Sequence, residues 1–210
     1  MPDYDATTAL LVVDLQNDFA NPQGSLYVKG GETVAAPINA EIERARAAGG
    51  HVFYTQDWHP PSTPHFEKDG GIWPAHCVME TWGAQLVPEL RVEGPVVRKG
   101  SNGEDGYSGF TMRDPQTGET VPTRLGELLA EAGVTRLVIA GLATDYCVRW
   151  TALDAREMGY PVTVLEHAIR AVDIQPGDGD RAREEMLAAG AMLENRQSLE
   201  RRGRRDGTPG

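Results

Sequence analysis

Short apolar runs alternate along the chain with longer segments whose apolar residues recur at helical spacing. The apolar runs cover residues 8–13, 51–55, 96–98, 137–140, 162–165 and 191–193, and runs of this length are typical of strands buried on both faces. The helical segments cover residues 37–48, 123–132, 144–159 and 180–189, and each is closed by a glycine. This alternation predicts an α/β fold, with a parallel six-stranded sheet covered by helices on both faces.

The chain shows no internal repeat and no linker, and its 210 residues suit a single domain. We expect that domain to cover residues 1–194. Residues 195–210 are rich in arginine and lack apolar periodicity, which predicts a disordered tail. Residues 114–118, Asp-Pro-Gln-Thr-Gly, are typical of a hairpin tip.

The net charge of the chain limits the kinds of molecule it can bind. The chain carries 31 acidic and 20 basic residues, with a formal net charge of −11, which argues against nucleic acid and against an anionic membrane surface. No apolar run approaches transmembrane length, and the first residues do not resemble a signal peptide. We therefore predict a cytoplasmic protein whose two cysteines, Cys77 and Cys147, are free thiols.

Chemically reactive residues follow four of the predicted strands. Asp14, Asp57, Lys99 and Cys147 each come at or soon after a strand's carboxyl end. In a parallel sheet these ends lie at one edge, where ligands bind. Carboxylates and lysines also mark the points where strands surface. That alternative explains any one of the residues well and all four together poorly.

Cys147 lies just after the predicted strand 137–140, which Gly141 interrupts. Thr144 and Asp145 offer side chains that could cap the following helix. In the first turn of a helix, unpaired N–H groups and the helix dipole favour a thiolate. Cys147 is thus a candidate nucleophile, although a small buried side chain filling a turn is the simpler alternative.

A long polar segment, residues 58–88, carries three of the five histidines. Asp57 and His59 are two apart, so they share one side of an extended segment. His65 and His76 follow in the same region. A mixed oxygen and nitrogen set suits Zn, Fe or Mn better than Ca or Mg. Solvated loop histidines are the alternative.

Six motifs in order resemble the nicotinamidase/pyrazinamidase group of isochorismatase-like cysteine hydrolases. They are Val-Val-Asp-Leu-Gln-Asn-Asp-Phe (12–19), Asp-Trp-His (57–59), Trp-Pro-Ala-His-Cys (73–77), Lys-Gly (99–100), Tyr-Ser-Gly-Phe (107–110) and Gly-Leu-Ala-Thr-Asp-Tyr-Cys-Val (141–148). The resemblance extends from residue 8 to the last strand. It implies a three-layer α/β/α sandwich around the six-stranded parallel sheet.

The resemblance also implies roles for the reactive residues. Cys147 would be the nucleophile and Asp14 the general base and acid. Lys99 would hold Asp14 ionised and favour the thiolate. The implied ligands of one divalent transition metal are Asp57, His59 and His76, with His65 matching a fourth ligand found in only part of the family.

Further implied residues surround the substrate. Phe19 and Trp73 match an aromatic pair that sandwiches the substrate ring, and Tyr107 matches a pocket residue. The N–H groups of Ala143 and Cys147 match the oxyanion hole, and the family has a cis peptide before the residue matching Ala143.

The implied activity is metal-dependent hydrolysis of a small aromatic amide, nicotinamide or pyrazinamide, through a thioester. A metal-free isochorismatase or N-carbamoyl amidohydrolase is the alternative enzyme, and a non-catalytic binding protein on the same scaffold is the alternative class. Tyr146 departs from relatives that have histidine there. Cys77 is expected to be a buried structural thiol, His167 has no assigned role, and a homo-oligomer stays open.

Overall fold

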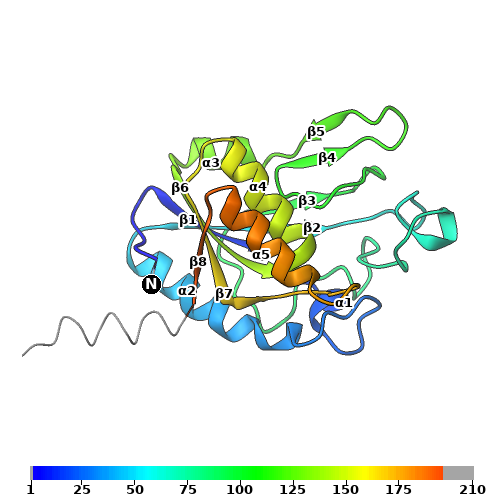
Figure 1. The fold of residues 1–210 in the computed structure, drawn as a ribbon, viewed down its shortest axis with the longest axis horizontal. Coiled ribbons are helices and arrows are strands. Elements are labelled where there is room, and N and C mark those ends of the chain that lie inside the picture. Colours follow the sequence, from blue (N-terminus) through cyan, green and yellow to red (C-terminus); the bar gives the residue numbers. More distant parts are fainter. Residues whose placement is uncertain (1, 196–210) are drawn as a thin grey trace, which may run out of the picture.

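The computed structural model describes residues 2–195, and their main element is a six-stranded sheet with helices on both faces (Figure 1). The six strands lie in the order β3-β2-β1-β6-β7-β8, and every neighbouring pair is parallel. This confirms the predicted fold class. The strands are β1 Thr8–Val13, β2 His51–Asp57, β3 Val96–Lys99, β6 Arg136–Leu142, β7 Val162–Arg170 and β8 Met192–Glu194.

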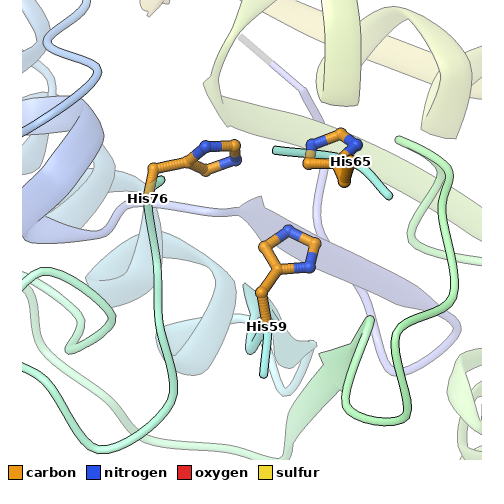
Figure 2. Close-up of side chains that lie close together, drawn as sticks. All are labelled: His59, His65 and His76. Carbon is orange, nitrogen blue, oxygen red and sulfur yellow. The ribbon is translucent and has the colours of Figure 1, made fainter. Parts of the chain in front are cut away.

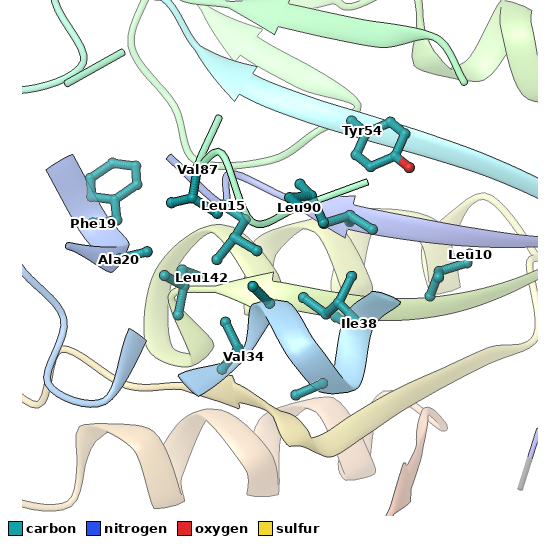
Figure 3. Packing of buried hydrophobic residues seen from close by; sticks show 14 of the residues in the cluster. Leu10, Leu15, Phe19, Ala20, Val34, Ile38, Tyr54, Val87, Leu90 and Leu142 are labelled. Atoms are coloured by element: carbon teal, nitrogen blue, oxygen red, sulfur yellow. The ribbon is translucent and has the colours of Figure 1, made fainter. Parts of the chain in front are cut away.

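One face of the sheet is covered by α2 (Ala35–Ala47). Alternate residues of the fully buried strand β1, Leu10 and Val12, point to this side. They share a hydrophobic cluster with Ile38 and Ile42 of the helix. Figure 3 shows Leu10 and Ile38 among the residues of this cluster. Every second residue of a strand lies on the same face of the sheet, and residues about four apart lie on the same face of a helix. The apolar residues of β1 and of α2 therefore meet in one layer.

The opposite face is covered by three helices, α3 (Leu125–Glu131), α4 (Arg149–Glu157) and α5 (Asp178–Ala188). Leu11 and Val13 of β1 belong to the cluster on this side. Helix α4 packs on β7 and α5, and α5 packs on β8. Both faces of β1 are therefore buried, as its continuous apolar sequence predicts.

Smaller elements extend the carboxyl edge of the sheet. A short helix, α1 (Asn17–Ala20), follows β1. Strands β4 (Thr111–Arg113) and β5 (Thr120–Pro122) form an antiparallel hairpin, which confirms the hairpin tip predicted at 114–118. Among the described residues, no helix is long and apolar enough to cross a bilayer. The predicted tail lies outside them, apart from Asn195.

Five of the six strands differ from their predicted ranges by one or more residues, and the differences at β6 and β7 matter most. Strand β6 does not stop at Gly141 but runs through it to Leu142. Gly141 has φ +121°, and a Cβ there would lie 2.0 Å from the carbonyl oxygen of Val13 on β1. The glycine thus permits close approach of two strands rather than ending one. Strand β7 is longer than predicted, so His167 lies within it rather than after it.

We predict that Gly141→Ala lowers the free energy of unfolding by about 3 kcal/mol or more. Positive φ costs an alanine about 1–2 kcal/mol, and forced overpacking adds about 1–3 kcal/mol. Gly159→Ala is the matched control, because Gly159 has φ +91° but no atom within 4 Å of an added Cβ. It should lose only the conformational part, about 1–2 kcal/mol. Equal urea midpoints for the two variants would contradict the close approach.

Candidate active site

The four strand-end residues meet because their strands are neighbours. Lys99 ends β3, Asp57 ends β2, Asp14 follows β1 and Cys147 follows β6, in the spatial order β3-β2-β1-β6. Lys99 Nζ lies 2.9 Å from Asp14 Oδ2 and 3.7 Å from Cys147 Sγ, and it also pairs with Asp57 Oδ1. All four residues are at least 95% buried. The predicted convergence at one sheet edge is confirmed.

Asp14 is held by the neighbouring strand. Its backbone has φ +45°, and its N–H donates to the carbonyl and hydroxyl oxygens of Thr55. The Thr55 hydroxyl donates in turn to Asp14 Oδ1 at 2.6 Å. One carboxylate oxygen therefore accepts a hydroxyl hydrogen while the other faces the Lys99 ammonium.

The pKa of Asp14 shifts in the opposite direction from the one expected, because Lys99 was expected to keep this carboxylate ionised. Burial, the largest influence, raises the pKa of Asp14, and the charge of Asp57 adds to it. Lys99 and the Thr55 hydroxyl act in the opposite direction, as expected of Lys99, but burial outweighs them. Burial acts to lower the pKa of Lys99, yet Asp14 and Asp57 raise it well above its ordinary value. Lys99 is therefore a permanent ammonium.

Cys147 lies in a π-helical turn, Thr144–Val148, that precedes α4. The predicted helix cap is wrong, because no side chain caps this turn. The Asp145 carboxylate instead accepts N–H hydrogens from Val172 and Asp173 after β7. The helix terminus and Lys99 were expected to favour a thiolate, but burial raises the pKa of Cys147 well above its ordinary value, although Lys99 opposes this.

Three buried histidines form a second cluster beside the first. The rings of His59, His65 and His76 point toward one another (Figure 2), with centroids 4.9–5.3 Å apart. One ring nitrogen from each lies within 4.8 Å of the others. The structure thus brings together all three histidines of the predicted metal set.

Two of these histidines are held with one nitrogen facing the cluster. His65 Nδ1 lies 2.8 Å from Asp105 Oδ1, and His76 Nδ1 lies 2.7 Å from the carbonyl oxygen of Pro74. An ionised carboxylate and a carbonyl can only accept, so each Nδ1 carries the hydrogen and each Nε2 keeps its lone pair. The hydrogen bond from His65 holds the pKa of Asp105 well below its usual range. This is the arrangement that metal-binding imidazoles require.

His59 supplies the test of whether a metal fits. Both of its ring nitrogens are buried and have no hydrogen-bond partner, an arrangement that is costly unless another group uses them. Burial lowers the pKa of His59 to about 4, so the ring is neutral. A cluster of three imidazole nitrogens suits Zn, Fe or Mn. A divalent transition metal therefore fits the residues present.

Asp57 lies between the two clusters. Its Oδ2 is 3.9 Å from His59 Nε2, while its Oδ1 pairs with Lys99. Burial opposes its ionisation, but Lys99, His59 and His76 together lower the pKa of Asp57 to about 2. This carboxylate can therefore serve the histidine cluster through one oxygen and the ammonium through the other.

An aromatic pocket opens onto both clusters. Phe19, Trp73, Tyr107 and Tyr146 line it together with Cys147, as do Leu26, Val28, Asp57, His65, His76, Ala143 and Val172. The Trp73 indole N–H donates to the Tyr107 hydroxyl at 3.0 Å, and Tyr146 packs edge-on against Trp73. The predicted substrate-contact residues therefore line one cavity. The Leu142–Ala143 peptide bond is cis, as the resemblance implied.

Sequence reasoning missed two residues that support the site. Gln16 is fully buried, its amide donates to the carbonyl oxygen of Asp57, and its Oε1 accepts the Asp57 N–H. Its position within the first motif, residues 12–19, could have identified it from the sequence. Asp105 had none, because it lies 40 residues from His65. Cys77 is a buried free thiol, as expected, and its N–H donates to Asp18.

Comparison with known proteins places this geometry in a family. The isochorismatase domain matches residues 8–197. The chain belongs to the isochorismatase family. Within it, the chain is 39% identical to the nicotinamidase of Escherichia coli, over 88% of this chain and 93% of that protein.

Two solved structures of family members resemble the fold closely. The pyrazinamidase of Pyrococcus horikoshii in complex with zinc is 37% identical, with a TM-score of 0.79, over 90% of this chain and 99% of that one. PnC1 from L. infantum in complex with nicotinate is 37% identical, with a TM-score of 0.83, over 92% and 96%.

The histidine cluster leads to a prediction at Gly100, which follows Lys99. A Cβ at Gly100 would lie 2.7 Å from His59 Nδ1. We expect Gly100→Ala to displace the His59 ring and weaken Zn²⁺ binding by about tenfold or more, measured by competition with a chromophoric chelator. Gly103→Ala is the control: it shares positive φ and the same loop, but its nearest neighbour is 3.9 Å away. Equal Zn²⁺ affinities in the two variants would contradict this packing.

Proposed function

We propose that this member of the isochorismatase family is a metal-dependent cysteine amidohydrolase that converts nicotinamide to nicotinate and ammonia and also accepts pyrazinamide. The observation that carries the proposal is that Asp14, Lys99 and Cys147 meet beside a cluster of three buried histidines. The nicotinamidases and pyrazinamidases among its relatives support the choice of substrate.

The pocket suits a flat aromatic amide. Phe19 and Trp73 both line it, and aromatic rings of this kind can stack on a pyridine. Tyr107 accepts the Trp73 N–H and so fixes the orientation of the indole. A substrate ring held there presents its carboxamide to Cys147, which lines the same cavity.

Asp14 is the general base in this mechanism. Because the pKa of Cys147 is raised, the thiol needs a base, and the raised pKa of Asp14 makes its carboxylate a stronger base than an ordinary aspartate. Sγ forms a bond to the carboxamide carbon as its proton passes to Asp14. The N–H groups of Ala143 and Cys147 would stabilise the oxyanion.

Collapse of the tetrahedral intermediate breaks the C–N bond and leaves a thioester. Asp14 returns its proton to the departing nitrogen, so ammonia leaves as a neutral molecule. Water then attacks the thioester carbon while Asp14 accepts one of its protons. The C–S bond breaks, Asp14 returns that proton to the Cys147 sulfur, and the product leaves as nicotinic acid, which loses its carboxyl proton to solvent to give nicotinate. Through its contacts with Asp14, Asp57 and Cys147, the Lys99 ammonium would hold the two carboxylates and the sulfur in place during both steps.

The metal would be held by His59, His65 and His76, with Asp57 as the oxygen ligand. When bound, it would supply a Lewis-acidic position that orients the ring nitrogen of the substrate. The metal-free alternative enzymes need no such cluster. The two unpartnered nitrogens of His59 favour the metal-dependent activity.

The nucleophile is tested by Cys147→Ala, which we expect to lower nicotinamide turnover at least about a thousandfold, because no thioester can form. Cys77→Ala is the matched control, since Cys77 is the other buried thiol and does not line the pocket. It should retain turnover within a few-fold of wild type. Near wild-type ammonia release by Cys147→Ala would rule out the covalent route.

The base is tested by Thr55→Val. The Thr55 hydroxyl lowers the pKa of Asp14, so its loss raises that pKa further. Asp14 must be ionised to accept the thiol proton, so the acid limb of the profile of kcat/KM against pH should move to higher pH. Thr163→Val, at a buried threonine of β7, should leave the limb in place. An unmoved acid limb in Thr55→Val would exclude Asp14 as the titrating base.

A further inference from the structure

We propose that Asp105 is a positioning residue for the metal site: its carboxylate fixes the hydrogen of His65 on Nδ1 and aims Nε2 at the cluster, and the β4–β5 hairpin holds the carboxylate in place. The inference rests on the metal site of the proposed function, but not on the identity of the substrate.

The contact between the two side chains is direct. Asp105 Oδ1 lies 2.8 Å from His65 Nδ1, and the same oxygen accepts the N–H of Gly106 at 2.8 Å. The His65 side chain is 6% exposed, whereas that of Asp105 is 31% exposed. A half-buried carboxylate therefore reaches from the surface to a buried imidazole.

Strand β4 holds Asp105 from the other side. The N–H of Asp105 donates to the carbonyl oxygen of Arg113 at 2.8 Å, and the N–H of Arg113 donates back at 2.6 Å. The Arg113 guanidinium also lies 3.4 Å from Asp105 Oδ2. Both carboxylate oxygens and both backbone polar groups of Asp105 thus have partners, which leaves the side chain little freedom to turn away from His65.

The hairpin is itself anchored at the other half of the site. The Thr111 hydroxyl on β4 donates to Asp154 on α4 at 2.6 Å, and α4 is the helix that follows the Cys147 turn. The N–H of Gly100, which follows Lys99, contacts Met112 Sδ at 3.2 Å. One short strand therefore connects the histidine cluster, the lysine strand and the nucleophile helix.

The chemistry explains why a carboxylate suits this position. An imidazole can carry its hydrogen on either nitrogen, and a fixed acceptor at Nδ1 leaves the Nε2 lone pair free for a metal. A carboxylate acceptor also increases the basicity of the ligand nitrogen. His76 obtains the same tautomer from the Pro74 carbonyl, and among the described residues His65 obtains it from Asp105.

The test measures metal binding rather than hydrolysis. Asp105→Ala should weaken Zn²⁺ affinity by about 10–100-fold and change the visible spectrum of the Co²⁺-loaded protein. Asp105→Asn keeps an oxygen acceptor and should show a smaller loss, which also guards against a folding defect in the alanine variant. Glu104→Gln is the matched control, because the neighbouring Glu104 carboxylate binds Asn102 instead, and it should keep wild-type affinity and spectrum.

A double-mutant cycle separates positioning from a general structural role. In the His65→Ala background, Asp105→Ala should cause no further loss of Zn²⁺ affinity. An equal loss in that background, or wild-type affinity in Asp105→Ala itself, would overturn the proposal. A wild-type protein that binds Zn²⁺ as described but does not hydrolyse nicotinamide would contradict the proposed function and leave the role of Asp105 intact.

Discussion

The site depends on one buried ammonium. Lys99 is 1% exposed and lies against the Asp14 carboxylate, the Asp57 carboxylate and the Cys147 sulfur. Two buried carboxylates cannot share a small volume at low cost without a cation between them. Loss of one partner of a buried ion pair typically costs about 3–5 kcal/mol. The same contact that stabilises this edge of the sheet also opposes the effect of burial on the pKa values of Asp14 and Cys147.

Strand order explains why these residues meet. Four consecutive positions in the sheet, β3, β2, β1 and β6, each deliver one reactive side chain to the carboxyl edge. From β1 the chain adds β2 and β3 on one side of the sheet, and then β6, β7 and β8 on the other. The connecting helices α2 and α4 therefore lie on opposite faces, which opens a crevice at the carboxyl edge between β1 and β6. The long segment after β2 then folds over the crevice and brings His65 and His76 to His59.

The local sequence pattern was enough to predict the existence of the strands and of most helices. It also predicted that the strand-end residues converge, namely Asp14, Asp57, Lys99 and Cys147. It failed where the deciding contact is distant in sequence or depends on burial. Gly141 looked like a strand end because the carbonyl of Val13 that it accommodates is invisible in the pattern. The Cys147 thiolate was predicted from a helix terminus, but desolvation by the surrounding core dominates its pKa. Asp105 could not be linked to His65 without the β4–β5 hairpin between them.

The central claim is that the Cys147 proton stays on sulfur in the resting protein, despite the adjacent ammonium, so that Asp14 must remove it. The most direct measurement is the ultraviolet absorbance of the thiolate along a pH titration, taken as the difference between wild type and Cys147→Ser. The account predicts that the thiolate signal appears only above the ordinary thiol value of about 8.5. A full thiolate signal already present at neutral pH would contradict it.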